Sequence, residues 1–260
     1  MISVVTWKWG SLFGPVYVNR LRSMMERNLH VRHKVICVTD DRTGIDPRVE
    51  IVPLPEPTHE TAHCSIRMRQ FDAVWAAFNL GSRSLLIDLD VVIVDDITPL
   101  VMRPEPLVCW WVDYAKMFAG GMILANAGAL NGLWHDYSVN PAAFSDAARR
   151  WPGGSRDGSD QDMLNYYIAT RGVKPAQWTC ADGLIAPHGE ARRNYRMAEG
   201  WRRVSLPKRR VKMEPVPAVP FDGTTAVPAL PPGAKMVFVG HRDKIVMDGA
   251  VHPWVRENWR

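Results

Sequence analysis

The stretch SLLIDLDVVIVDD, residues 84–96, is an apolar run that only aspartates interrupt. A strand covered by helices on both faces has this composition, whereas a strand with one solvated face alternates between apolar and polar residues. We therefore expect residues 84–96 to form one buried strand at the centre of a sheet. In open α/β sheets, ligands bind beyond the carboxyl end of such a strand.

Strand and helix patterns alternate on both sides of this run. Apolar or β-branched runs predict further strands at 2–6, 33–39, 49–52, 107–112, 120–126 and 235–239, while helical spacing predicts helices at 16–25, 62–78 and 159–170. In the helix expected at 62–78, Phe71, Val74, Trp75 and Phe78 fall at i, i+3, i+4 and i+7, which predicts a buried apolar stripe. The alternation indicates an α/β fold with a Rossmann-like, mostly parallel central sheet flanked by helices.

Composition sets the limits within which a function can be sought. The 260 residues, 47% hydrophobic and 23% charged, are typical of one globular domain. No basic leader and no apolar run of membrane-spanning length is present, so a cytoplasmic protein is expected. The four cysteines form no CxxC pair, which argues against a zinc knuckle or a disulfide framework.

Positive charge is concentrated in residues 192–212 of a chain whose formal net charge is +5. A solvated loop, a nucleic-acid site and a peripheral contact with an acidic membrane surface are all compatible with this run. Nucleic acid is not expected, because Tyr195 and Trp201 are the only aromatic residues interleaved with the basic ones. Phosphoryl transfer on a P-loop is also disfavoured, since no GxxxxGK[ST] sequence occurs.

Asp88 and Asp90 are the strongest candidates for a functional site. In a strand, residues two apart lie on the same side, about 6 to 7 Å from each other. Two like charges flanked by apolar runs are costly to bury unless a cation compensates them, and Mg²⁺ or Mn²⁺ prefers carboxylate oxygens. The alternative is that the strand ends at Ile87 and the aspartates cap a turn.

An ordered set of motifs resembles the retaining glycosyltransferases related to family 8, the group of glycogenin and the lipopolysaccharide galactosyltransferases. These motifs span nearly the whole chain: VVTWKWG (4–10), YVNRL (17–21), VICVTDD (35–41), LLIDLDVVIVDDITPL (85–100) and HPWVRENWR (252–260). The resemblance implies a single GT-A domain over 1–260, with a nucleotide-binding part at 1–100 and an acceptor part at 101–260 that contains the Pro-rich loop 214–233. It also implies a metal-dependent hexosyltransferase that uses a nucleotide sugar, UDP-linked, and retains the anomeric configuration.

The same resemblance implies roles for individual residues. The nucleotide sugar would be bound by residues at two strand ends, by an arginine of the helix before the aspartate pair and by one late lysine: Thr6, Trp7, Lys8, Arg69, Asp88, Leu89 and Lys244. Arg67 lies in the same segment as Arg69, which is the preferred candidate. The metal ligands would be Asp88, Asp90 and His241, with Mn²⁺ or Mg²⁺ as the cofactor. Asp160 and Gln161 match the family's DQ pair and would act on the donor sugar or the acceptor, a carbohydrate, a lipid-linked molecule or a protein.

Two departures from the family pattern leave an alternative open. Phe118-Ala119-Gly120-Gly121 lacks the asparagine that family members carry before the DQ pair, and His241 lies two residues beyond the family's histidine. A non-catalytic protein that binds a nucleotide sugar or a carbohydrate would tolerate both departures.

Ser159 is a suitable N-cap for the helix expected at 159–170, with Asp162 in the reciprocal capping position.

Overall fold

The computed structural model describes residues 1–55, 63–113, 115–185, 201–206, 210–215, 230, 232–239 and 253–260. Its helices are α1 (Pro15–Asn28), the 3₁₀ helix η1 (His63–Phe71), α2 (Ala73–Asn79), α3 (Thr98–Val101), α4 (Asn131–Val139), α5 (Pro141–Arg150), α6 (Asp160–Arg171), η2 (Cys180–Asp182) and α9 (Pro253–Asn258). Among the helices so described, none is both long and apolar enough to cross a lipid bilayer.

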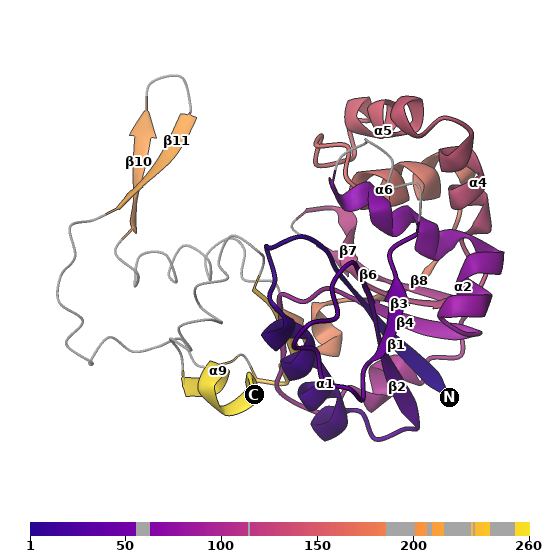
Figure 1. Ribbon diagram of the computed structural model, residues 1–260. Coiled ribbons are helices and arrows are strands. Elements are labelled where there is room, and N and C mark those ends of the chain that lie inside the picture. The colour runs from indigo at the N-terminus through magenta and orange to yellow at the C-terminus, as the bar shows by residue number, and fades with distance from the viewer. Residues whose placement is uncertain are drawn as a thin grey trace.

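The fold is α/β, built on a seven-stranded mixed sheet (Figure 1). The strands lie in the order β3-β2-β1-β4-β7-β6-β8, so β4 occupies the central position, as the sequence predicted. Four of the six pairings are parallel, and β7 is antiparallel to both of its neighbours. The strand bounds are β1 (Ile2–Lys8), β2 (His33–Thr39), β3 (Glu50–Pro53), β4 (Arg83–Ile87), β6 (Leu107–Val112), β7 (Met117–Asn126) and β8 (Ala176–Trp178).

Two further sheets accompany the large one. β5 (Val91–Ile93), β12 (Met236–Phe238) and β9 (Leu184–Ile185) form a three-stranded sheet in the order β5-β12-β9. β10 (Trp201–Leu206) and β11 (Arg210–Pro215) form a two-stranded antiparallel ribbon. Of the expected Pro-rich loop at 214–233, Glu214 and Pro215 belong to β11, and most of the remainder lies outside the described residues.

The expectation of one strand over residues 84–96 is wrong. The chain forms β4 and β5, two strands in different sheets, and residues 88–90 between them belong to neither. If the strand continued through residues 88–90, the Asp88 and Asp90 carboxylates would be buried among apolar side chains. Burial of unpaired charges in this way costs free energy. The bend leaves both aspartates partly exposed, while Leu89 remains buried in the core.

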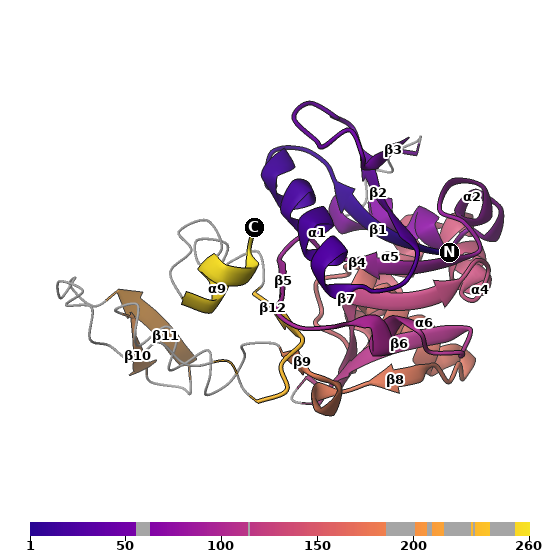
Figure 2. The same ribbon diagram turned by 90° about the horizontal axis from the view of Figure 1, so that it is seen from below.

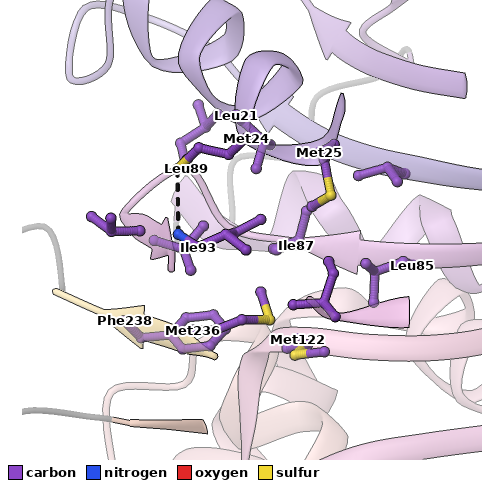
Figure 3. Packing of buried hydrophobic residues seen from close by; sticks show 14 of the residues in the cluster. Leu21, Met24, Met25, Leu85, Ile87, Leu89, Ile93, Met122, Met236 and Phe238 are labelled. Atoms are coloured by element: carbon purple, nitrogen blue, oxygen red, sulfur yellow. Dashed lines mark hydrogen bonds between the residues drawn. The ribbon is translucent and has the colours of Figure 1, made fainter. Parts of the chain in front are cut away.

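The two faces of the large sheet are covered by different helices (Figure 2). Residues of α1, β5, β12 and α9 form one apolar core, and residues of η1, α2, α4, α5 and α6 form the other. Figure 3 shows the first core, in which Leu89 and Ile93 lie beneath α1. Met24 Sδ of α1 accepts the Ile93 N–H, at 3.3 Å. This contact anchors the segment that contains Asp88 and Asp90 to α1.

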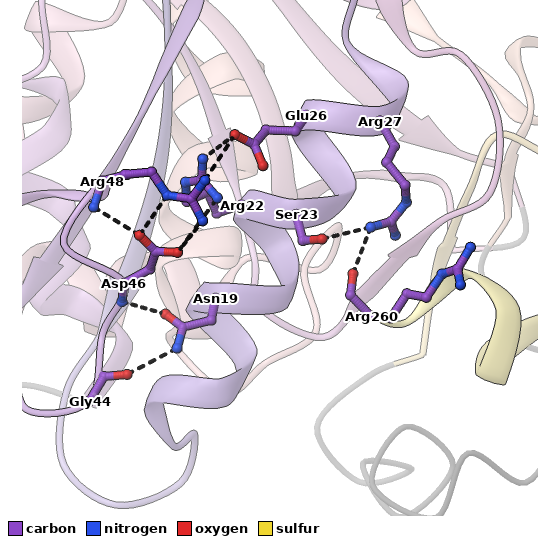
Figure 4. A network of polar contacts seen from close by, with 9 residues as sticks. All are labelled: Asn19, Arg22, Ser23, Glu26, Arg27, Gly44, Asp46, Arg48 and Arg260. Atoms are coloured by element: carbon purple, nitrogen blue, oxygen red, sulfur yellow. Dashed lines mark hydrogen bonds and ion pairs between the residues drawn. The ribbon is translucent and has the colours of Figure 1, made fainter.

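The C-terminal segment packs on α1 at the same face. The Trp259 ring meets the Tyr17 ring edge-on, with 5.1 Å between centroids. Arg27 donates to the main-chain carbonyl groups of Asn258 and Arg260, and Figure 4 shows the second of these contacts beside the ion-pair network of Asp46. Cationic donors suit the end of a helix, where carbonyl groups lack helical partners.

The single helix expected at 62–78 is also wrong in its detail. Residues 63–71 are 3₁₀ rather than α-helical, and a new helix, α2, begins after Asp72, whose carboxylate accepts the N–H groups of Val74 and Trp75. Of the predicted apolar stripe, Phe71 is buried and Trp75 is half-buried, whereas Val74 and Phe78 are 80% and 90% exposed. The N-cap at Asp72 resets the helical phase, because it starts a new helix in the middle of the pattern.

Candidate functional site

Arg67 lies between two carboxylates that are distant in the sequence. Its Nη1 donates to Asp88 Oδ1, and its Nη2 lies 2.5 Å from Asp160 Oδ2. The side chains of Arg67 and Asp160 are 14% and 6% exposed, whereas that of Asp88 is 30% exposed. Without a cation, the carboxylates of Asp88 and Asp160 would repel each other at this partly buried place. The Arg67 guanidinium group offsets that repulsion.

Three elements bring this ion triad together. Arg67 belongs to η1, Asp88 directly follows the last residue of β4, and Asp160 is the first residue of α6. The expected N-cap is confirmed, since the Ser159 hydroxyl accepts the Asp162 N–H at 3.4 Å. Asp160 therefore lies at the positive end of a helix dipole, where a carboxylate is favoured.

Asp162 does not complete a capping box, contrary to the sequence expectation. Ser159 N–H donates instead to Asp157 Oδ1, at 2.9 Å. The fully buried Asp162 carboxylate accepts hydrogen bonds from the preceding loop: the N–H groups of Ser155, Asp157 and Gly158, and the Ser155 hydroxyl. The loop wraps around this carboxylate and leads directly into the site.

Gly120 and Gly121 of β7 form the adjacent wall of the site. Asp88 N–H donates to the Gly121 carbonyl at 3.0 Å, and a Cβ placed on Gly121 would lie 2.9 Å from Asp88 Oδ2. Gly120 N–H donates to Gln161 Oε1 at 2.9 Å, and a Cβ on Gly120 would lie 3.2 Å from Gln161 Cβ. No side chain fits comfortably between β7 and these groups at Gly120 or Gly121.

β7 bulges at these glycines, and α6 binds the displaced backbone. Cys109 of β6 pairs with Ile123, but the next residue, Trp110, pairs with Ala119, so residues 120–122 have no partner in β6. Gln161 of α6 accepts the Gly120 N–H at the bulge, and buried Asn165 binds the backbone just before it: its amide group both accepts the Phe118 N–H and donates to the Phe118 carbonyl, each at 2.8 Å. Sequence reasoning missed Asn165, although two adjacent glycines within a strand are a signal of a bulge.

The three candidates on β1 lie at its carboxyl end but are buried. β1 and β4 are parallel neighbours, so their carboxyl ends share one edge of the sheet. Trp7 Nε1 donates to Gln70 Oε1 at 3.0 Å, and Lys8 Nζ donates to the Asp41 carbonyl at 3.5 Å. Thr6 Oγ1 is fully buried and has no hydrogen-bond partner within the part of the chain that the structure describes.

We expect Thr6→Val to raise the free energy of unfolding by about 1 kcal/mol, because it removes a buried hydroxyl without a partner. Urea unfolding of the wild type and the variant measures the change. A loss of stability would contradict the expectation and would mean that the Oγ1 atom has a partner. Ligand titration of the same variant would then report separately on any contact between Thr6 and a nucleotide.

The remaining candidates are not all brought to the triad. Arg69 lies 3.4 Å from Asp72 Oδ2, with its guanidinium carbon 4.8 Å from the centre of the Trp134 ring, so Arg67 is the arginine that meets Asp88. The Leu89 side chain belongs to the core, which leaves its backbone as the only part that could meet a ligand. His241 and Lys244 lie outside the described residues.

Burial and charge shift the protonation of this cluster. Burial raises the pKa of Asp160, and Arg67 offsets only part of that effect. Burial lowers the pKa of Arg67, but Asp160 and Asp88 more than compensate, so its net shift is upward. Burial and then the Asp160 charge also raise the pKa of the nearby Cys64 thiol to about 11. Cys64 is therefore a neutral thiol at neutral pH and no nucleophile.

The raised pKa of Asp160 gives the stability a distinct pH dependence. A folded state that binds the proton more tightly than the unfolded chain is favoured at low pH, and this advantage is lost as the pH rises from about 4 through the raised pKa. We expect the stability of the wild type relative to Asp160→Asn to fall over that window. Urea unfolding of both proteins between pH 4 and 7 tests this. A relative stability that grows with pH would show that Arg67 lowers the pKa instead.

No model of a known protein family matches this chain, and no curated protein matches it either.

The residues around Asp88 fit a divalent cation in part. Asp88 Oδ1 is taken by Arg67, while Oδ2 lies against the Gly121 backbone; Asp90 is partly exposed, and its carbonyl accepts the Val239 N–H at 2.8 Å. Carboxylate oxygens are the donors that Mn²⁺ and Mg²⁺ prefer. Within the described ranges, no group of three His, Cys, Asp or Glu side chains is placed to hold a metal ion. A third protein ligand would have to come from elsewhere, and His241 is the candidate.

Proposed function

We propose that this chain is a GT-A glycosyltransferase related to the retaining enzymes of family 8, which transfers a hexose from a UDP-linked sugar to an acceptor. The observation that supports this most is the ion triad of Arg67, Asp88 and Asp160 beyond the carboxyl end of β4. In open α/β sheets this edge is where ligands bind. Buried ion pairs contribute little net stability. A triad that joins partly buried charges from three elements therefore supports a role beyond holding the sheet together.

In this proposal the two ends of the donor meet different parts of the sheet edge. Thr6, Trp7 and Lys8 at the end of β1 serve the nucleoside, and Asp160 and Gln161 at the start of α6 serve the sugar. Asp88 and Asp90 hold Mn²⁺ or Mg²⁺, with His241 as the further ligand. The cation, when bound, neutralises charge on the diphosphate leaving group. Lys244 and Arg69 are further candidates for the diphosphate.

Gln161 contributes to the proposed sugar site mainly by positioning Asp160. Its Oε1 is occupied by Gly120 N–H, and its Nε2 lies 3.3 Å from Met117 Sδ. These contacts fix the start of α6 against β7 and so hold Asp160 where Arg67 can reach it. In this proposal Asp160 is the acid that meets the sugar.

Thermal unfolding with UDP, UDP-hexoses and GDP-mannose, each with and without Mn²⁺, tests the binding step. A ligand at a hundred times its Kd stabilises the folded state by about 2.7 kcal/mol. We expect a Mn²⁺-dependent rise in Tm with a UDP-sugar, and UDP release on turnover. Binding without UDP release would identify a non-catalytic binder, and no shift with any nucleotide would overturn the proposal.

A matched pair of variants tests the assignment of the site. Asp90→Ala should abolish Mn²⁺-dependent UDP release, since it removes one of two carboxylate ligands. Asp95→Ala alters a 62% exposed aspartate five residues further along and should leave the release rate unchanged. Equal activity of both variants would contradict a metal site at Asp90.

A further inference from the structure

The Arg67 guanidinium group is bound to the same carboxylate that the proposed function assigns to a divalent cation. Arg67 Nη1 donates to Asp88 Oδ1. The second oxygen of Asp88, Oδ2, lies against β7, where a Cβ on Gly121 would be 2.9 Å from it. One oxygen of Asp88 is therefore held by Arg67, and the approach to the other is narrowed by the Gly121 backbone.

A divalent cation and Arg67 compete for Asp88, because both are positively charged. Mg²⁺ binds carboxylate oxygens at about 2.1 Å, so an ion on either oxygen of Asp88 would lie within about 5 Å of the guanidinium group. The Arg67 side chain is only 14% exposed, and water screens little of the repulsion between like charges in such a place. Binding of the cation therefore favours the departure of Arg67 from Asp88.

Asp160 offers Arg67 a second partner. Arg67 Nη2 lies 2.5 Å from Asp160 Oδ2, so a guanidinium group that left Asp88 would still be paired. Arg67 Nε is buried and has no hydrogen-bond partner in the part of the chain that the structure describes. Nε and Nη2 lie along one edge of the guanidinium group, and two donors on one edge can bind a carboxylate through two parallel hydrogen bonds.

We propose that Arg67 exchanges partners when a divalent cation binds Asp88, an inference that rests on the proposed function. The guanidinium group releases Asp88 Oδ1 and pairs with the Asp160 carboxylate through both Nε and Nη2. The exchange frees Asp88 for the cation and gives the buried Nε a partner. It also keeps the buried charges of Arg67 and Asp160 paired throughout, which avoids the cost of leaving either one alone.

Arg67→Met should tighten the binding of Mn²⁺ about tenfold, because it removes the charge that competes for Asp88. Free Mn²⁺ has an electron paramagnetic resonance signal that is lost on binding, so titration of the full chain without any nucleotide measures the Kd. Arg171→Met is the charge-matched control. Arg171 pairs with Asp136 at 2.7 Å and lies at the other end of α6, about 16 Å along the helix from Asp160. Its loss should change the Mn²⁺ affinity by less than about threefold.

A second pair of variants keeps the test decisive if Arg67→Met folds poorly. Asp160→Asn leaves Arg67 with Asp88 as its only acidic partner in the triad and should weaken Mn²⁺ binding relative to the wild type. Adding Arg67→Met to Asp160→Asn removes the competing charge without leaving a buried carboxylate unpaired at position 160. This double variant should bind Mn²⁺ more than about tenfold more tightly than Asp160→Asn alone.

Nuclear magnetic resonance of the arginine Nε–H groups observes the exchange directly, with diamagnetic Mg²⁺ as the cation. We expect the Arg67 signal, identified by its loss in Arg67→Met, to shift when Mg²⁺ is added to the wild type. An unmoved signal, Mn²⁺ binding in Arg67→Met no tighter than in Arg171→Met, or no Mn²⁺ binding by any variant would overturn the proposal. Tighter Mn²⁺ binding in Arg67→Met without UDP release by the wild type would overturn the sugar transfer and not the exchange. The reverse result would overturn the exchange alone.

Discussion

Arg67→Met should lower the free energy of unfolding by about 3–5 kcal/mol, because it leaves the buried Asp160 carboxylate without its cation. The ion pair is close and shielded from water, so little of its energy is lost to solvent screening. Urea unfolding at pH 7 measures the change, and UDP release under the proposed assay should also be lost. A change below about 1 kcal/mol would mean that Asp160 is neutral in the folded protein.

Two further variants isolate the cause. Arg69→Met alters the neighbouring arginine, which has a longer ion pair with Asp72 and a contact with the Trp134 ring, and should cost only about 1 kcal/mol. Combining Arg67→Met with Asp160→Asn removes the unpaired charge and should recover part of the stability. If Arg69→Met proved the more costly, the site would have to be centred on α2 and α4 instead.

Asp162→Ala is expected to cost about 3–4 kcal/mol, since it removes the acceptor of three backbone N–H groups and one hydroxyl in a fully buried place. The loop that loses its support contains Arg156 and Gly158, both in the left-handed region at φ 69° and 73°. Loss of the carboxylate should therefore loosen residues 153–158. Urea unfolding and amide hydrogen exchange of this loop are the measurements.

Asp146→Ala is the matched control for this variant. Asp146 lies on α5, is 51% exposed and meets Arg149 at 3.2 Å, so its removal should change the free energy of unfolding by less than about 0.5 kcal/mol. Protection of the loop in Asp162→Ala equal to that in the wild type would show that other contacts hold it. Because the loop leads into Asp160, ligand binding should weaken along with the protection.

Much of the fold could be predicted because local patterns depend on near neighbours. The apolar run at 84–87 marks the central strand, Pro15 begins α1, and Ser159 caps α6. Two elements were predicted wrongly, the unbroken strand at 84–96 and the single helix at 62–78, and in both an aspartate lies within an apolar pattern. Periodicity does not show whether such an aspartate continues an element or ends it.

Several residues of the candidate site were predicted from the sequence, whereas the way they meet was decided by packing. Asp88, Asp90, Asp160 and Gln161 are recognisable in the sequence. The fold brings the carboxylates of Asp88 and Asp160 to one guanidinium group, that of Arg67. The choice of Arg67 over Arg69 was not predictable, because the turn of the 3₁₀ helix η1 determines which of the two reaches the end of β4.

The sequence by itself determined the class of fold, the central strand and the acidic residues at its end, since apolar periodicity and helix caps act within a few residues. Only the tertiary structure decided that β7 bulges at Gly120 and Gly121, that Asn165 binds the Phe118 backbone beside the bulge, and that Arg67 joins Asp88 to Asp160. These contacts join residues 21 to 93 positions apart. They depend on how closely strands and helices approach one another, which no local pattern encodes.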